Sequence, residues 1–203
     1  MQKYAFASRA GQDAAGYNKI NCNETLLQHG IGKDMALNLF CLFDGSGPQG
    51  QAFSRALKKH TLRSLVEKYE AERDKRLMLR NSIEEPPTGF DLCHKLLDHA
   101  IMHAKKTPRV DQSQSGASSL FCLMHGRQLV IKSAGDVRCL VVTRMGQFKQ
   151  LSTEHTCSNP SELHRLRALG ATIKPHDDPI DWRPKLICSG DPVSATRGLG
   201  FTR

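Results

Sequence analysis

The chain has 203 residues, of which 39% are hydrophobic and 24% charged, with 16 Gly and 9 Pro. This composition is typical of a folded globular protein and excludes a collagen-like, mucin-like or wholly disordered chain. A chain of this length is expected to form one domain, residues 1–203, that buries roughly 70% of the surface its unfolded form exposes. No apolar run reaches the ~20 residues that a membrane-spanning helix needs, so we expect no membrane span.

The charge balance is basic, because 29 Lys and Arg against 20 Asp and Glu give a net charge of +9. Such an excess favours an acidic partner, which is either an acidic protein surface or nucleic acid. The cations concentrate in residues 58–80, where Tyr69 is the one aromatic residue. A stacking platform for single-stranded nucleic acid is therefore poorly supported, and a solvated helix face is the simpler interpretation.

The cysteines are odd in number and form no C-x-x-C pair. Most of them lie inside or beside apolar segments, which is typical of buried thiols and unlike a disulfide framework or a zinc knuckle. The seven are Cys22, Cys41, Cys93, Cys122, Cys139, Cys157 and Cys188. We therefore expect a reducing compartment, the cytoplasm, with an organellar or cytoskeletal complex as the alternative.

The first half of the chain predicts one strand and two helices. The apolar run of residues 37–43 ends at Asp44, which is typical of a buried strand that enters a tight turn. Apolar residues then recur at helical spacing, and the helix is expected to extend over residues 53–80. Residues 81–88 contain two consecutive prolines and are predicted to be a linker. A second helix is predicted over residues 90–104.

The second half of the chain predicts short strands and one short helix. The apolar segments that alternate with turns, and that predict an antiparallel meander, are residues 120–124, 129–131, 139–143 and 148–151. A helix over residues 160–169 fits Pro160 in its first turn and Gly170 just past its end. Because the helices come first and the hairpins afterwards, the fold class is α+β rather than a parallel α/β sheet.

Residues 45–50 match the pattern G-x-G-x-x-G between a strand and a helix, as a dinucleotide site requires. Against that interpretation, Pro48 removes an amide that could face a phosphate, and no acidic residue ends a second strand ~20 residues later. Asp44 suits a divalent cation better, because such cations prefer carboxylate oxygens held on a rigid edge. The turn is therefore a candidate metal site.

Short segments throughout the chain resemble, in the correct order, the motifs of the metal-dependent protein phosphatases of the PP2C family. They are residues 19–24 (KINCNE, like R-x-x-M-E-D), 42–47 (LFDGSG, like FDGHGG), 115–119 (SGASS, like SGSTA), 134–138 (AGDVR, like GDSR), 151–155 (LSTEH, like LTxDH), 162–170 (like ExxRxxxxGG) and 196–200 (TRGLG, like SRxxG). Each match is modest, but seven matches in order are specific.

The resemblance implies an αββα sandwich, in which helices flank two antiparallel sheets and a binuclear Mg²⁺ or Mn²⁺ site lies at one end. Such a site activates a water that attacks a phosphoserine or phosphothreonine. By motif position, the resemblance assigns Asp44, the carbonyl of Gly45, Glu24 and Asp136 to the metal site. It assigns Lys19 to phosphate binding.

Several positions depart from the family pattern. Ser46 replaces a histidine suited to protonating the leaving alkoxide, which a serine hydroxyl cannot do near neutral pH. Lys19 replaces an arginine and exchanges a bidentate fork for a point charge. Two further metal aspartates of the family, on later DG and DN segments, have no counterpart in these 203 residues. Asp44, Ser46 and Lys19 are therefore catalytic by equivalence only, and Mg²⁺ or Mn²⁺ is expected to bind weakly or not at all.

The sequence predicts a PP2C-like sandwich without the last strands and helix of that fold and without its C-terminal metal-binding segment. The first hypothesis is a pseudophosphatase, a non-catalytic subunit whose protein partner covers the incomplete sandwich. The alternatives are a Mg²⁺- or Mn²⁺-dependent protein Ser/Thr phosphatase and a phosphoprotein-binding module without turnover. His99 and His103 lie four residues apart on a predicted helix but lack the Glu of H-E-x-x-H, so we interpret them as a surface pair.

Overall fold

A five-stranded antiparallel sheet forms the centre of the computed structural model, in the order β1-β2-β3-β10 with β4 also paired to β3. The structure describes residues 4–12, 15–78, 89–104, 106, 110–174, 184–188 and 191–200. The strands of the main sheet are β1 (Asn23–Ile31), β2 (Asp34–Ser46), β3 (Gly116–His125), β4 (Gln128–Ala134) and β10 (Leu199–Gly200). This antiparallel arrangement with helices confirms the expected α+β class.

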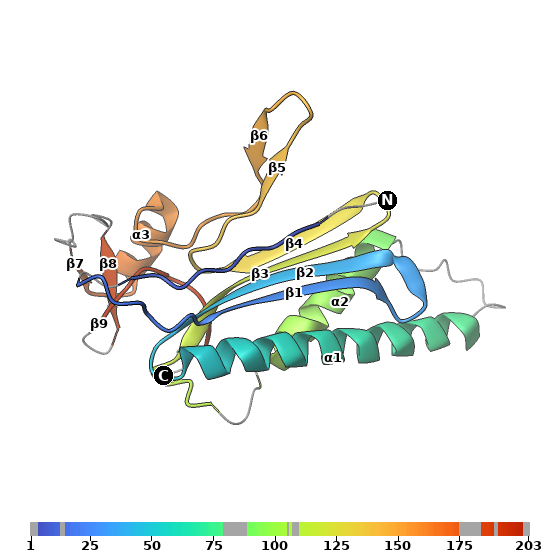
Figure 1. Cartoon of the computed structure of the whole chain (residues 1–203), viewed down its shortest axis with the longest axis horizontal. Helices are drawn as coiled ribbons and strands as arrows, with labels where there is room; N and C mark the ends of the chain where they lie inside the picture. Colours follow the sequence, from blue (N-terminus) through green and yellow to red (C-terminus); the bar gives the residue numbers. More distant parts are fainter. Residues whose placement is uncertain are drawn as a thin grey trace.

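Two long helices, α1 (Gly50–Met78) and α2 (Gly89–Ala104), lie along one face of this sheet (Figure 1). Their buried residues recur at helical spacing and join those of the sheet in one core cluster, which includes Leu57 and Leu65 of α1 and Leu96 and Leu97 of α2. Both helices occur where the periodicity predicts them. The predicted linker, residues 81–88, lies outside the described residues.

The alternation of side chains along β2 separates the core from the opposite face of the sheet. Leu37, Leu39, Cys41 and Phe43 are buried in the cluster that contains the two helices. The intervening residues from Phe40 onward point away from the helices, because successive side chains of a strand lie on opposite faces. The predicted strand 37–43 is thus the central part of a longer one.

The later strands differ from the predicted meander. The first two predicted segments form β3 and β4 of the main sheet, whereas β5 (Leu140–Val142) and β6 (Phe148–Gln150) form a separate two-stranded sheet. A third, three-stranded sheet was not predicted and consists of β7 (Ile173–Lys174), β8 (Lys185–Cys188) and β9 (Asp191–Val193). The segments therefore belong to different sheets.

The short helix α3 (Pro160–Ala168) confirms the prediction for residues 160–169. Its cap is Asn159, whose side chain accepts a hydrogen bond from the backbone N–H of Ser161. Gly170 follows the helix with a φ of 71°, a conformation that glycine adopts readily. In the part of the chain that the structure describes, no helix is long and apolar enough to cross a membrane.

The face of the main sheet that points away from α1 and α2 is apolar and only half-buried. Its half-buried residues are Leu27, Phe40, Leu42, Leu120, Cys122 and Ile131. The N-terminal segment runs past this sheet (Figure 1), and the ring of Tyr4 packs edge-on against that of Phe40 with centroids 6.1 Å apart. This face is where a second layer of the expected sandwich would pack.

A carboxylate clamp ties α3 to the loop that precedes β10. Glu162, whose side chain is 4% exposed, accepts hydrogen bonds from Arg165 Nη2 at 2.8 Å, Thr196 Oγ1 at 2.8 Å and Arg197 Nη2 at 2.6 Å. The Arg197 guanidinium, followed by Arg165, holds the pKa of Glu162 far below its usual range. The clamp fixes the position of residues 196 and 197.

We predict that Phe43→Ala lowers the free energy of unfolding by about 3–5 kcal/mol, because it leaves a cavity in the core. The ring of Phe43 packs edge-on against Phe121 with centroids 5.5 Å apart. Urea unfolding monitored by circular dichroism measures the change. Met78→Ala, at a side chain 86% exposed, is the control and should change the value by less than about 0.5 kcal/mol. A similarly small effect of Phe43→Ala would contradict this packing.

We predict that Glu162→Gln lowers the free energy of unfolding at pH 7 by about 1.5–3 kcal/mol, through loss of charge-assisted hydrogen bonds. The native pKa of Glu162 lies below its ordinary value of 4.5. The clamp therefore stabilises the fold above pH 4.5, and this contribution is lost as the pH falls from there toward the native pKa.

The difference between wild type and Glu162→Gln should shrink over that acidic range in the same urea assay. Glu67→Gln is the control, because its exposed carboxylate is paired with the exposed Arg63, and it should cost less than about 1 kcal/mol. A difference for Glu162→Gln that does not vary with pH would show that the charge of the clamp is unimportant.

Candidate functional site

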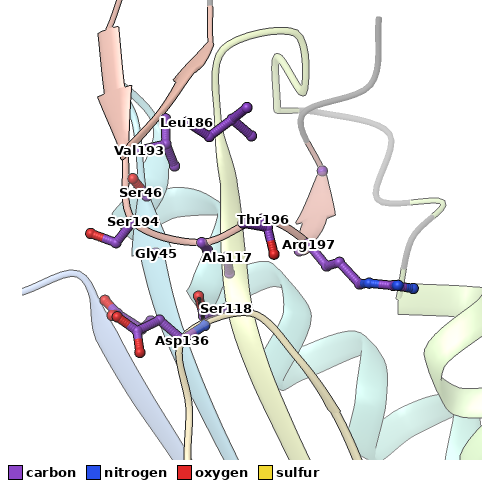
Figure 2. Close-up of a pocket in the computed structure, with 14 residues that line it drawn as sticks. Gly45, Ser46, Ala117, Ser118, Asp136, Leu186, Val193, Ser194, Thr196 and Arg197 are labelled. Atoms are coloured by element: carbon purple, nitrogen blue, oxygen red, sulfur yellow. Dashed lines mark hydrogen bonds between the residues drawn. The ribbon is translucent and has the colours of Figure 1, made fainter. Parts of the chain in front are cut away.

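A cavity of about 490 Å³ lies where the ends of β2 and β3 approach β8, β9 and the loop before β10 (Figure 2). Its walls come from segments far apart in the sequence. The lining residues include Asp44, Gly45, Ser46, Ser118, Asp136 and Arg197. The turn after the predicted strand 37–43 therefore opens into this cavity.

The two carboxylates of the cavity, Asp44 and Asp136, come from the two strands that flank β3, namely β2 and β4. Asp44 lies on β2 opposite Ser118 of β3, on the face away from the helices. Asp136 follows β4, and its backbone N–H donates a hydrogen bond of 3.1 Å to Ser118 Oγ. Figure 2 shows Asp136 beside Ser118 at one end of the cavity. The hydroxyl of Ser118 thus positions the turn that carries the second carboxylate.

The two carboxylates influence each other. Partial burial raises the pKa of Asp44, and the nearby negative charge of Asp136 raises it further. Both effects disfavour the ionised form of Asp44, so this pair is destabilising near neutral pH as long as no cation lies between them. A divalent cation would remove this penalty, because it neutralises both carboxylates.

Two glycines allow the backbone to approach closely at this site. A Cβ atom on Gly45 would lie 2.1 Å from the carbonyl oxygen of Gly50, at the start of α1. A Cβ atom on Gly135, which has a φ of 105°, would lie 2.3 Å from Ser118 Oγ. A larger residue at position 45 would push the end of β2 away from the start of α1, and one at position 135 would push the turn that carries Asp136 away from β3.

Glu24 does not reach the cavity. It pairs with Phe43 in the β1–β2 register, whereas Asn23 pairs with Asp44, so Glu24 lies on the helix side of the sheet. Its carboxylate accepts hydrogen bonds from Lys58 Nζ at 2.9 Å and Arg55 Nε at 3.4 Å, and the Lys58 contact is the main reason that its pKa is lowered. The expected place of Glu24 in the metal site is therefore corrected: the structure separates it from Asp44.

The remaining predicted residues are placed as follows. Ser46 and Gly45 line the cavity at the end of β2. Lys19 lies on the exposed segment before β1, where its backbone N–H bonds to the carbonyl oxygen of Gly11 at 2.8 Å. Lys19 is absent from the described wall of the cavity. His99 and His103, whose rings lie 4.2 Å apart on α2, do not contribute to it either.

The donor set fits one cation better than a binuclear centre. Among the described residues, no group of three or more His, Cys, Asp or Glu side chains could hold a metal ion. The cavity supplies the carboxylates of Asp44 and Asp136, with Gly45 beside them. Mg²⁺ is commonly bound by one or two carboxylates and several waters, so this pair could hold a single, largely hydrated ion.

Sequence reasoning did not assign a role to His155, which connects two walls of the site. His155 Nδ1 accepts a hydrogen bond of 3.3 Å from the N–H of Gly135. The His155 carbonyl oxygen accepts one of 2.8 Å from the N–H of Thr196. Burial lowers the pKa of His155, which favours the neutral ring that can accept this bond. The only available signal was its place in the LTxDH-like segment.

Arg197 was also known only as part of a motif. Its side chain extends away from Asp136 in Figure 2, and its guanidinium is bound to Glu162. Arg197 therefore shapes the wall of the cavity through its backbone, and the clamp with Glu162 holds that wall in place.

Comparisons with known proteins agree with this architecture. Residues 4–203 match the profile of the family described as "Protein phosphatase 2C". "Probable protein phosphatase 2C 41" of Arabidopsis thaliana is 26% identical over 197 residues, covering 93% of this chain and 54% of that protein. "Probable protein phosphatase 2C 61" of the same plant is 28% identical over 196 residues, with coverages of 93% and 55%. The chain thus spans about half the length of the curated relatives it matches.

Two solved structures share the fold. Serine-threonine phosphatase 2C from Toxoplasma gondii superposes with a TM-score of 0.69 at 17% identity, over 97% of this chain and 66% of that one. A sex determining protein of C. elegans superposes with a TM-score of 0.68 at 18% identity, over 97% and 43%. At these identities the likeness establishes the fold alone, whereas the family match covers almost the whole sequence. The chain belongs to the protein phosphatase 2C family.

Proposed function

We propose that this chain is a pseudophosphatase, a non-catalytic member of its family that serves as an interaction subunit of a larger assembly. The observation that carries the proposal is the sparse donor set of the cavity. Among the described residues, Asp44 and Asp136 are its only carboxylates. Glu24 is held on the other side of the sheet by Lys58 and Arg55.

Two carboxylates are a weak basis for metal-assisted hydrolysis. A two-metal site stabilises both the attacking and the leaving oxygen, and a bound metal lowers the pKa of the attacking water. A single hydrated ion at Asp44 and Asp136 provides one metal charge, so it cannot stabilise both the attacking and the leaving oxygen. Ser46 supplies a hydroxyl where protonation of the leaving group needs an acid that titrates near neutral pH. Both features favour the loss of turnover.

The apolar outer face of the main sheet supports the role as a subunit. Phe40, Leu42 and Leu120 on that face are half-buried, and exposed apolar patches of this kind commonly mark protein–protein contact. The proposed partner covers this incomplete sandwich. The net charge of +9 favours a partner with an acidic surface.

An active Mg²⁺- or Mn²⁺-dependent protein Ser/Thr phosphatase is the second candidate. It is favoured by the position of Asp44 beside Asp136, because a cation would relieve the repulsion between them. A phosphoprotein-binding module without turnover is the third candidate. It has less support, because Lys19, the expected phosphate ligand, is not part of the described cavity wall.

We predict that the purified chain with Mn²⁺ releases no more phosphate from a phosphothreonine peptide or an aryl phosphate than Asp44→Ala does. Phosphate release is measured colorimetrically, with Asp74→Ala on the exposed side of α1 as the matched control. Metal-dependent phosphate release that Asp44→Ala abolishes and Asp74→Ala leaves intact would contradict the proposal that the chain is a pseudophosphatase. Peptide binding without release, lost in Asp44→Ala, would favour the third candidate.

We predict that Asp44→Asn raises the melting temperature of the metal-free chain at pH 7. The raised native pKa of Asp44 means that its ionised form opposes folding above its ordinary pKa of 3.8. The gain should therefore shrink as the pH falls toward that value and disappear below it, where the carboxylate is protonated in both states. Differential scanning fluorimetry measures the melting temperatures of the wild type and of Asp44→Asn.

Mn²⁺ provides a second arm of the same experiment. It should raise the melting temperature of the wild type more than that of Asp44→Asn, since the substitution removes one of the two carboxylates. Asp74→Asn is the control and should behave as the wild type. A lower melting temperature for Asp44→Asn at pH 7 would show that the two carboxylates do not oppose folding.

A further inference from the structure

The hairpin formed by β5 and β6 projects from the main sheet (Figure 1). All residues of Leu140–Val142 and Phe148–Gln150 are exposed. In the described part of the chain, β5 and β6 pair with each other and with no third strand. A two-stranded hairpin is marginally stable in water on its own. A further strand on either edge of the hairpin would therefore stabilise it.

The hairpin is nevertheless closed at both ends. At the tip, the N–H of Thr143 donates to the carbonyl oxygen of Gln147 at 2.7 Å. At the base, the N–H of Leu151 donates to the carbonyl oxygen of Cys139 at 2.8 Å. The N–H of Cys139 in turn donates to Ser152 Oγ at 2.8 Å. The two strands thus form a preorganised edge, which lowers the cost of adding a strand.

The pairing register shows which backbone groups face outward. Hydrogen-bonded and non-hydrogen-bonded pairs alternate along an antiparallel ladder. Because the pairs 139–151 and 143–147 are hydrogen-bonded, the pairs Leu140–Gln150 and Val142–Phe148 are the non-hydrogen-bonded ones. The N–H and C=O groups of Leu140 and Val142 therefore point outward along the free edge of β5.

The side chains of this edge are apolar and exposed. Leu140, Val142 and Phe148 share one face of the hairpin and are 51%, 64% and 74% exposed. Met145 at the tip is 87% exposed. An exposed apolar edge strand is a template for pairing with another chain. By contrast, Gln150 on β6 folds its side chain onto the Ser152 carbonyl oxygen and Glu154 Oε1, beside the edge of that strand. Of the two edges of the hairpin, that of β5 is therefore the more suitable for pairing with a strand of another chain.

The charge of the hairpin indicates what kind of segment can bind at the free edge of β5. Between Asp136 and Glu154 the sequence contains no acidic residue. Arg138 is paired with Glu154 at 2.7 Å, while Arg144 and Lys149 are exposed cations on the hairpin itself. A second copy of this hairpin would bring like charges together, whereas an acidic segment would be attracted.

We propose that the free edge of β5 binds an extended segment of a partner protein by strand addition, and that this segment alternates apolar with acidic residues. Its backbone pairs with Leu140 and Val142, its apolar side chains pack beside those of the same two residues, and its acidic side chains lie near Arg144 and Lys149. This inference rests on the interaction role proposed above, and it is independent of whether the cavity catalyses hydrolysis.

The test is a selection of random displayed decapeptides on the purified chain, followed by fluorescence anisotropy with the enriched peptides. The enriched peptides should alternate apolar with Asp or Glu. Val142→Pro removes an outward N–H without disturbing the β5–β6 bonds, and it should weaken binding about tenfold or more. Val142→Lys should have the same effect if the proline disturbs the fold. Phe148→Pro, the matched change on β6, should leave binding within about twofold.

A second comparison tests the charge. The double variant Arg144→Glu with Lys149→Glu should weaken binding about tenfold or more, while Lys59→Glu on the exposed side of α1 should not. The proposal is overturned if no peptide is enriched, if Phe148→Pro abolishes binding and Val142→Pro does not, or if sedimentation shows a dimer that Val142→Pro dissociates. Phosphatase activity in a chain that still captures these peptides would overturn only the pseudophosphatase proposal.

Discussion

The antiparallel register that places Asp44 of β2 between Asn23 of β1 and Ser118 of β3 governs both the core and the cavity. Along β2, alternate residues up to Phe43 pack against the helices, and the following residue, Asp44, faces the other way. A slip of one residue would exchange the two faces. Burial of Phe43 therefore fixes where Asp44 lies, and the same register places Glu24 on the helix side, where Lys58 neutralises it.

The long elements of the fold could be predicted because their signals are local. The apolar stripes of α1 and α2 extend over several turns, and α3 carries a cap at Asn159 and a glycine after its end. The assignment of strands to sheets could not be predicted, because it depends on contacts between distant segments. The segments of β4 and β5 look alike in sequence, yet β4 extends the main sheet while β5 pairs with β6 alone among the described strands.

The candidate site likewise contains some residues that the sequence could predict and others that it could not. Asp44 and Asp136 could be identified because each ends an apolar strand and lies in a recognisable motif, and the structure brings them to one cavity. Glu24 was assigned by its position at the end of the motif-like segment 19–24, although the two-residue period of β1 puts it and Asn23 on opposite faces. The clamp between Glu162 and Arg197 spans 35 residues, a separation at which sequence spacing carries no geometric information.

These features describe a PP2C chain in which the described wall of the cavity carries two carboxylates, Asp44 and Asp136. Titration of the metal-free chain with Mn²⁺, followed by electron paramagnetic resonance and calorimetry, tests this account most directly. The account predicts at most one bound Mn²⁺, with a dissociation constant of about 10⁻⁴ M or weaker, and no binding by Asp44→Asn. Two Mn²⁺ ions bound at micromolar concentration, together with metal-dependent phosphate release, would contradict it.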